Sequence, residues 1–347
     1  MRRIILSIVL VCLLALPVSG MEFQAPRVPD SVDQMVPEEA ASFPEGLWNV
    51  LSAVLKQFAP SLSEAGACCS QLGCIMLLCS LTSTIAPGLS KQAVDLCGVG
   101  AVSAALMQST RSLLALGAQT VTELSAYGRL LLPVLASALA AQGGVSTSAA
   151  LYVATAALDA ALSSLLSGVM LPMLWVQLAL GIGCAAIEIP MLSQLRRFVT
   201  GACAWILKAV LYIFTAYMTI TGAVSGAADA TAVRAAKLAI SGAVPVVGGI
   251  LSDASEAVLV SAGVMGSGAG IYGILTVLAL FGAPFVRLGV QYLLLRIVTA
   301  LGTSFDGGGC VRAAEAFSGV LGLMLGMVGT QTVLLLISTV CFMKGVA

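Results

Sequence analysis

The stretch AFSGVLGLMLGMVGTQTVLLLISTVCFM, residues 316–343, decides the fold class because it contains no charged side chain. A helix needs about 20 mainly apolar residues to cross the hydrocarbon core of a bilayer. Comparable uncharged runs occur at residues 65–90, 130–158, 160–187 and 257–286. The sequence therefore predicts an all-α polytopic membrane protein, with the lipid bilayer as its surroundings.

The overall composition agrees with this class and excludes several functions. Charged residues make up 9% of the chain and hydrophobic residues 59%, whereas about 25% of residues are charged in a soluble domain. Sixteen basic residues balance sixteen acidic ones, so no electrostatic basis for nucleic-acid binding exists. The chain has no histidine, which excludes Ser-His and Cys-His catalysis and the histidine-dependent zinc motifs.

Neither the cysteines nor the glycines form a recognised cofactor motif. The cysteines lack a C-x-x-C pair and are expected to be small buried apolar residues, except Cys310, whose polar DGGGC loop predicts an exposed thiol. Gly268, Gly270 and Gly273 match G-x-G-x-x-G, but they lie inside an uncharged run instead of a βαβ unit. We therefore predict no metal, cofactor or nucleotide site, and we assign these glycines to close helix packing. Gly322 and Gly326 show the same small-x-x-x-small spacing.

Three regions follow one another along the chain. Residues 1–20 are typical of a cleavable signal peptide, with two arginines before a short apolar stretch; an uncleaved anchor is the alternative. Residues 21–64 predict an acidic extracytoplasmic segment, which contains an amphipathic helix at 46–60. This helix lies either at the membrane interface or against its own helical bundle. Residues 65–347 predict the multi-span transmembrane domain.

Turn signals and charges divide that domain into about six to eight spans. Gln142-Gly143-Gly144 predicts a turn, and Pro172 predicts a kink or separation between helices. The pair Arg196-Arg197 predicts a cytosolic loop, and Arg287 predicts a second one. This assignment places a short span at residues 291–303.

The same assignment has two consequences at the C-terminal end of the chain. It leaves Arg312 outside the cytosol, against the positive-inside rule. Lys344 predicts a cytosolic C-terminus. For residues 91–129, which carry several charges, one span near 96–117 is preferred and amphipathic surface helices are the alternative.

The stretch RAAKLAISGAVPVVGGILSDASE, residues 234–256, provides the candidate functional site. Its apolar part is too short and too broken to span a bilayer, and it is flanked by charges that are costly in lipid unless they face protein or water. Asp253 and Glu256 also fit a capping box, which is a structural explanation for this acidic pair. The candidate gate or structural break comprises Arg234, Lys237, Gly242, Pro245, Gly248, Gly249, Asp253 and Glu256.

An intramembrane aspartyl protease is the enzyme class that the sequence allows us to test. Such an enzyme needs two aspartates that share a proton. Asp95 and Asp159 are the candidates near predicted spans, and neither lies in a glycine-flanked aspartate motif. We therefore predict that the protein is not an enzyme.

The stretch TGAVSGAADATAVRAAKLAISGAVPVVGGILSDASEAV, together with LPVLASALAAQGGV, resembles the stage III sporulation protein AE family of endospore-forming bacteria. This resemblance implies a multi-pass protein of the mother-cell membrane that surrounds the forespore. It also implies partners, namely the other stage III sporulation membrane proteins of a secretion-like channel complex, some of which supply the ring-forming domains and the ATPase. It carries no catalytic residues.

The resemblance and the broken central stretch lead to one preferred function. We expect a non-enzymatic membrane subunit of this channel complex, as its permease or gate component. Two alternatives remain open: a stand-alone secondary transporter of a small solute, and a purely structural membrane scaffold.

Overall fold

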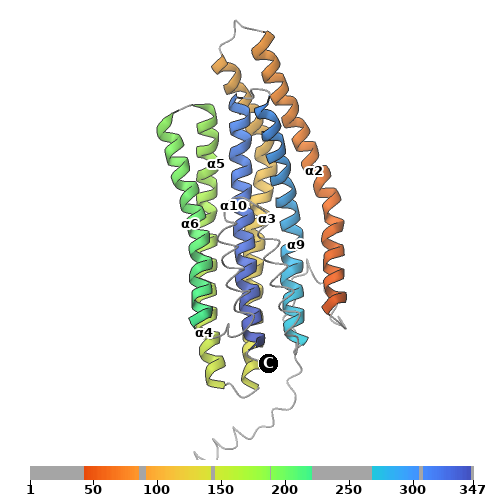
Figure 1. Ribbon diagram of the computed structural model, residues 1–347, viewed down its shortest axis with the longest axis vertical. Helices are drawn as coiled ribbons and strands as arrows, with labels where there is room; N and C mark the ends of the chain where they lie inside the picture. Colours follow the sequence, from red (N-terminus) through yellow and green to blue (C-terminus); the bar gives the residue numbers. More distant parts are fainter. Residues whose placement is uncertain are drawn as a thin grey trace, which may run out of the picture.

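The computed structural model describes residues 43–85, 91–141, 145–187, 189–220, 268–304 and 308–344. Throughout these residues the chain is helical (Figure 1), which confirms the all-α class. The predicted signal peptide and the candidate gate lie outside them. The helices are α2 (Phe43–Ile85), α3 (Lys91–Ala141), α4 (Val145–Leu165), the π-helix η1 (Leu166–Met170), α5 (Leu171–Ala186), α6 (Pro190–Ile220), α9 (Gly268–Thr303) and α10 (Gly308–Lys344).

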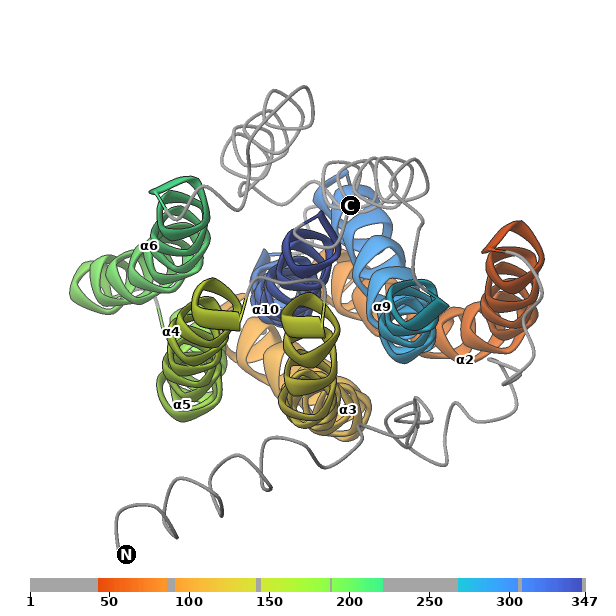
Figure 2. The ribbon, with the colours of Figure 1, turned by 90° about the horizontal axis from the view of Figure 1, so that it is seen from below.

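The helices form an elongated bundle of antiparallel rods around α10. Figure 1 and the perpendicular view in Figure 2 show α2 and α6 at opposite edges, with α3 and α9 close to α10. The helix α10 packs against α3, α4, α5, α6 and α9. In the described part of the chain, six rods are long and apolar enough to cross a membrane, with α4, η1 and α5 counted as one rod.

The helix α2 shows where the amphipathic stretch at 46–60 lies, which the sequence left open between the membrane interface and the helical bundle. The helix α2 continues from Phe43 through Pro60 to Ile85 without interruption. Val54 packs against Gly282 of α9, and Trp48 on the opposite face is 68% exposed. The stretch therefore docks onto its own bundle, as the beginning of one long helix.

The prediction of a cytosolic loop at Arg287 is wrong. The helix α9 runs from Gly268 to Thr303, and both Pro284 and Arg287 lie within it. A proline is tolerated in a membrane helix when neighbouring helices compensate for the hydrogen bond that it removes. The helix α9 has such neighbours, because α2, α3 and α10 all pack against it. A separate short span at 291–303 therefore does not exist.

The two predicted breaks in the middle of the chain have different outcomes. The turn at Gln142-Gly143-Gly144 is confirmed, because α3 ends at Ala141 and α4 begins at Val145. Pro172 does not separate two helices. It lies at the start of α5, directly after η1, whose wider hydrogen-bonding pattern joins α4 to α5 in one rod. The charged region 91–129 likewise lies within one long helix, α3.

Close helix packing is seen at three of the glycines assigned to it, Gly273, Gly322 and Gly326. A Cβ on Gly322 would lie 2.9 Å from the Tyr292 ring of α9, and one on Gly326 would lie 3.3 Å from Leu207 of α6. Gly273 packs in the same way against Leu131 of α3. Small residues let membrane helices approach closely, as predicted for these positions.

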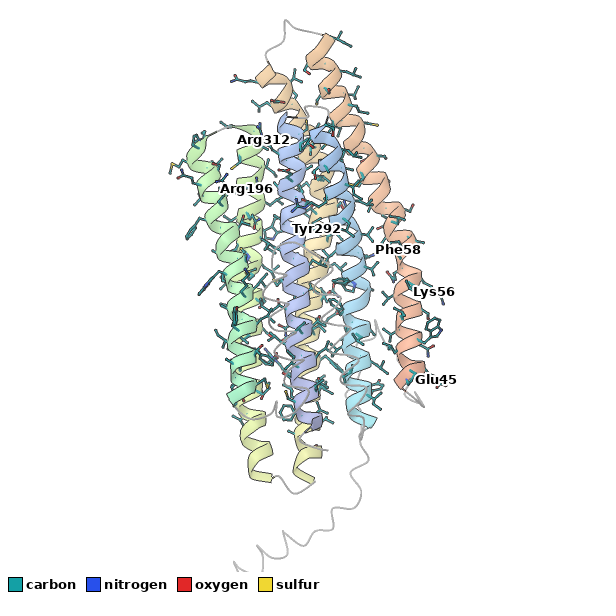
Figure 3. All side chains as sticks on the ribbon, in the orientation of Figure 1. Glu45, Lys56, Phe58, Arg196, Tyr292 and Arg312 are labelled. Carbon is teal, nitrogen blue, oxygen red and sulfur yellow. The ribbon has the colours of Figure 1, made fainter. Side chains whose placement is uncertain are left out.

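One end of the bundle holds the turns that join α5 to α6 and α9 to α10. Figure 3 shows Arg196 and Arg312 at this same end. The predicted topology, which put them on opposite sides, is therefore wrong. The helix α10 is 37 residues long and runs from this end to the other, so Lys344 and the Arg196-Arg197 pair cannot share a side of the membrane. Continuity of α9 accounts for the error, since the false loop at Arg287 inverted everything after it.

Two hydrogen bonds join α10 to its neighbouring helices at this end. The backbone N–H of Gly309 donates to Oδ1 of Asp95, 3.4 Å away, which satisfies a free donor at the start of α10. The Arg312 guanidinium donates to the Ala185 carbonyl at the end of α5, with 3.5 Å between the two atoms. Gly308 adopts a φ of +43°, which favours glycine. The expected exposed thiol, Cys310, is instead fully buried beside Cys79 and Gly98.

Candidate functional site

The predicted gate and break residues lie outside the described residues, so their role stays a prediction. This statement covers Arg234, Lys237, Gly242, Pro245, Gly248, Gly249, Asp253 and Glu256. The described helices contain a different candidate site, which is an open groove halfway along the bundle, lined by polar and small apolar side chains.

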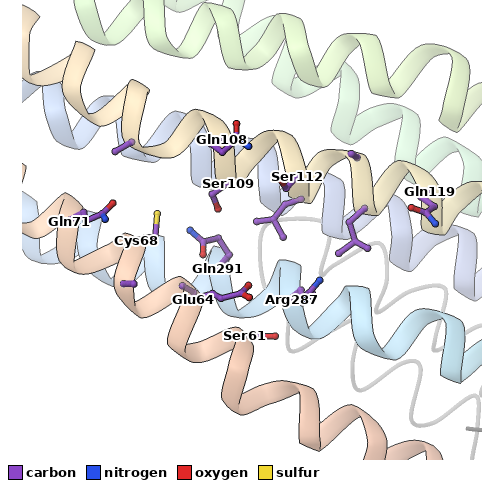
Figure 4. A pocket seen from close by; sticks show the side chains of 16 residues that line it. Ser61, Glu64, Cys68, Gln71, Gln108, Ser109, Ser112, Gln119, Arg287 and Gln291 are labelled. Carbon is purple, nitrogen blue, oxygen red and sulfur yellow. The ribbon is translucent and has the colours of Figure 1, made fainter. Parts of the chain in front are cut away.

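This groove lies between α2, α3 and α9 and has a volume of about 760 Å³. Figure 4 shows polar side chains from all three helices turned toward it. We refer to it as the α2–α3–α9 groove. Its polar lining consists of Ser61, Glu64, Cys68, Gln71, Gln108, Ser109, Ser112, Gln119, Arg287 and Gln291.

Helical periodicity explains why α2 and α3 each present a polar stripe. On α2, Ser61, Glu64, Cys68 and Gln71 recur at intervals of three or four residues, so they share one face. On α3, Gln108, Ser112 and Gln119 are four and seven residues apart, so they also share one face. On α2 two or three positions separate successive members in the sequence, whereas on α3 Gln108, Ser109 and Ser112 belong to the polar run QSTRS, residues 108–112.

The α9 wall supplies two residues one turn apart, Arg287 and Gln291. Gln291 is only 4% exposed, and its Nε2 has no hydrogen-bond partner among the residues that the structure describes. A buried donor without a partner costs about 1–3 kcal/mol, so a polar group positioned in the groove would offset this cost.

The groove lining carries one charge of each sign. Glu64 lies on α2 and Arg287 on α9, both exposed and both lining the groove (Figure 4). Each charge near the centre of a membrane helix costs about 2.5–3.5 kcal/mol if it faces hydrocarbon. The lining therefore requires water or polar protein, and not lipid tails, as its neighbour.

The chemistry of the lining suits the passage or docking of a polar chain more than a reaction. Amides, hydroxyls, one thiol, one carboxylate and one guanidinium offer donors and acceptors to a polar chain. Among the residues that the structure describes, no group of three potential ligands could hold a metal ion.

The aspartyl-protease arrangement fails on distance. Asp95 lies at the start of α3, and the Asp159 carboxylate lies beside Gly128, which is 33 positions further along the same helix. At 1.5 Å per residue this separation is roughly 50 Å. The two carboxyls therefore cannot share a proton.

Sequence reasoning missed the groove for two reasons. Glu64 was assigned to an extracytoplasmic segment, and Arg287 was assigned to a loop. A signal was nevertheless present in the polar spacing of Gln108, Ser112 and Gln119, which marks one face of a helix. What remained hidden was the convergence of three helices that are distant in the sequence.

The fold and the groove together define a polytopic α-helical membrane protein with an open polar surface at mid-height. The family profile described as stage III sporulation protein AE matches residues 31–345. The chain therefore belongs to the stage III sporulation protein AE family, and the resemblance seen in the sequence is confirmed.

A curated relative supports the same assignment. The stage III sporulation protein AE of Bacillus subtilis (strain 168) is 20% identical over 200 residues, which cover 58% of this chain and 50% of the relative. The chain thus spans about half the length of the curated relative that it matches. No solved structure matches this chain.

Proposed function

We propose that this chain is a non-enzymatic membrane subunit of a sporulation-specific channel complex in the mother-cell membrane around the forespore. In this role it serves as the permease or gate component, and other stage III sporulation membrane proteins are its partners. Family membership supports the sporulation role. The single observation that supports a passage is the open groove, whose lining includes Glu64 and Arg287 about halfway along the bundle.

Energetics favour a hydrated or protein-covered groove. Glu64 and Arg287 together would cost several kcal/mol against hydrocarbon. A channel subunit avoids this cost because its groove faces either the aqueous passage or a polar partner helix. A complex of several membrane proteins supplies both environments.

Thiol accessibility tests whether the groove contacts water. The ten native cysteines are replaced, and one cysteine is introduced at Ser112 in the groove or at Leu78, which is 63% exposed on α2. A charged, membrane-impermeant thiol reagent is then applied to sporulating cells. Because only a hydrated thiolate reacts, the Ser112→Cys variant should label at least about tenfold faster than Leu78→Cys. Equal, slow labelling at both positions would contradict a water-lined passage.

The same experiment separates the gate from the structural scaffold. Labelling at Ser112 in the assembled complex supports a passage. If the isolated chain is labelled and the assembled complex is not, a partner helix fills the groove, and the scaffold is the better description.

A charge substitution tests whether sporulation depends on the groove. We expect Arg287→Gln to lower the count of heat-resistant spores while the amount of membrane-inserted protein stays constant. Arg296→Gln on the same helix is the matched control, since Arg296 lies over the Tyr292 ring and does not line the groove. Normal spore counts for Arg287→Gln would remove the functional role of this groove.

A further inference from the structure

A second polar cluster lies inside the bundle and is separate from the groove. Thr155, Asp159 and Ser163 follow one another on α4 at intervals of four residues, so they share one face. All three are buried, with exposed fractions of 0%, 2% and 4%. A carboxyl with this degree of burial is rare unless it is paired. An ionisable residue within a membrane span is by default a functional candidate.

Three neighbouring helices converge on this face of α4. The Gln331 Nε2 of α10 donates to Oγ of Ser163 at 2.9 Å, and the hydroxyls of Thr155 and Tyr217 of α6 lie 3.2 Å apart. On α3, Gly128 leaves room for the carboxyl, because a Cβ at that position would lie 3.7 Å from Oδ2 of Asp159. We name Thr155, Asp159, Ser163, Tyr217 and Gln331 the α4 polar seam.

Two acceptors of the seam have no hydrogen-bond donor among the described residues. They are Oδ1 of Asp159 and Oε1 of Gln331, and both are buried. An ionised carboxylate is costly to bury unless donors and counter-charges surround it, whereas a protonated carboxyl is neutral and also supplies a donor. The unpartnered oxygens therefore favour a protonated Asp159 carboxyl over an ionised one.

The charged and titratable groups around Asp159 do not remove this need. From α3, the Arg129 guanidinium acts on the carboxyl through its charge, but Arg129 is exposed. From α6 comes the Tyr217 phenol, which contacts Thr155. From α10 comes the uncharged Gln331. None of these groups donates a hydrogen bond to Oδ1 of Asp159.

We propose that Asp159 is a proton-binding site within the membrane domain, and that its carboxyl carries a proton in the folded bundle. The proton completes the α4 polar seam between α3, α4, α6 and α10. This site does not depend on the proposed channel function, because the groove is built by α2, α3 and α9 and shares no residue with the seam. Each proposal can therefore fail without the other.

Infrared spectroscopy of the full chain in detergent tests this proposal directly. A protonated carboxylic acid has a carbonyl stretch that is separate from the bands of carboxylates and backbone amides. At about pH 7, exposed aspartates and glutamates are ionised, so an acid band must come from a protected carboxyl. The band should be present in the unaltered chain and lost in Asp159→Asn.

Glu64→Gln is the matched control, because it also converts a carboxyl into an amide, but at an exposed position. We expect the acid band to be unchanged in this variant. Equal acid bands in the unaltered chain and in Asp159→Asn, or the absence of an acid band from the unaltered chain, would overturn the proposal. The absence of this band would also indicate that the Asp159 carboxylate is ionised and is stabilised by a water molecule or by Arg129.

Isotope labelling keeps the test valid if Asp159→Asn does not fold. Labelling the aspartate carboxyl carbons of the unaltered chain with ¹³C should displace the acid band, and an undisplaced band would overturn the assignment to an aspartate. Arg129→Ala keeps Asp159 in place and removes the nearby positive charge. Because this charge favours the ionised form, its removal should leave the acid band at about pH 7 at least as strong as in the unaltered chain. An acid band that disappears in Arg129→Ala would also overturn the proposal.

Discussion

The helices α10 and α2 have similar lengths and both are apolar enough to span a membrane, yet they have opposite surroundings. In the most apolar window of α10, 72% of the residues are buried inside the protein, compared with 22% in α2. The buried side chains of α10 face five other helices, whereas α2 exposes large apolar side chains such as Trp48 and Leu78. Hydrophobicity therefore indicates membrane insertion but does not distinguish a lipid-facing helix from a central one.

The different burial of α10 and α2 reflects the forces that hold membrane helices together. Lipid tails are as apolar as leucine, so helices associate through close packing and hydrogen bonds instead of burial from water. Accordingly, α10 carries the glycines that meet Tyr292 and Leu207, and it carries Gln331, which hydrogen-bonds across to α4. The outer face of α2 needs neither feature.

Truncating matched phenylalanines should give the largest contrast. Phe317 of α10 is fully buried, while Phe198 at the edge of the bundle on α6 is 73% exposed. We expect Phe317→Ala to lower the free energy of unfolding by about 3–5 kcal/mol, because it leaves a cavity. Phe198→Ala should change it by no more than about 0.5 kcal/mol. Unfolding in detergent measures both, and equal losses would contradict the central position of α10.

Matched glycine substitutions probe close packing with a smaller effect. Gly322→Ala places a methyl group 2.9 Å from the Tyr292 ring, and we expect it to cost about 1–3 kcal/mol of stability. Gly201→Ala on α6 meets nothing within 4 Å and should be neutral or stabilising by up to about 1 kcal/mol. Thermal unfolding of the two variants checks the sign as well as the size, and a stabilising Gly322→Ala would contradict the tight α9–α10 contact.

A third contrast concerns the arginines at one end of the bundle. Arg312 of α10 donates to the last turn of α5, whereas Arg197 of α6 is exposed. A cation at a helix C-terminus contributes about 0.3–2 kcal/mol, so Arg312→Gln should destabilise the protein by this amount and Arg197→Gln should not. The same unfolding assay applies. Equal stability of both variants would show that the α5–α10 contact has no energetic role.

The smallest expected change in stability comes from Gln291 in the groove. Gln291→Leu removes a buried, unpartnered Nε2 and should leave stability unchanged or raise it by about 1 kcal/mol. If the groove is a passage, spore counts should nevertheless fall, because an apolar residue replaces a polar one in the lining. A fall in both stability and spore counts would indicate that Gln291 has a structural role.

The sequence predicted the class of fold well and the arrangement of helices poorly. Uncharged runs and the Gln142-Gly143-Gly144 turn are local features, and local features were read correctly. Arg287 was misread because a single arginine between apolar stretches is typical of a loop, and only the neighbouring helices reveal that it faces a groove. That error reversed the predicted side of Arg312.

The candidate sites show the same division between local and non-local information. Asp159 was recognised as a carboxyl near predicted spans, but its relation to Gln331 and Gly128 depends on contacts between residues far apart in the sequence. Cys310 was expected at the surface because its loop is rich in glycine. The glycines instead allow α10 to begin close against α3, which buries the thiol.

The five residues of η1 control the angular phase of one membrane rod. Buried side chains recur every four residues along it, at Leu162, Leu166, Met170 and Leu174. In a regular α-helix such a row rotates by about 40° per step away from its partner, and the wider π turn reverses this drift. If the same five residues formed a regular α-helix, α4 would be rotated against α5, because a π turn rotates less per residue than an α turn. The Asp159 carboxyl would then turn away from Gly128 of α3 while the rod kept nearly its full length.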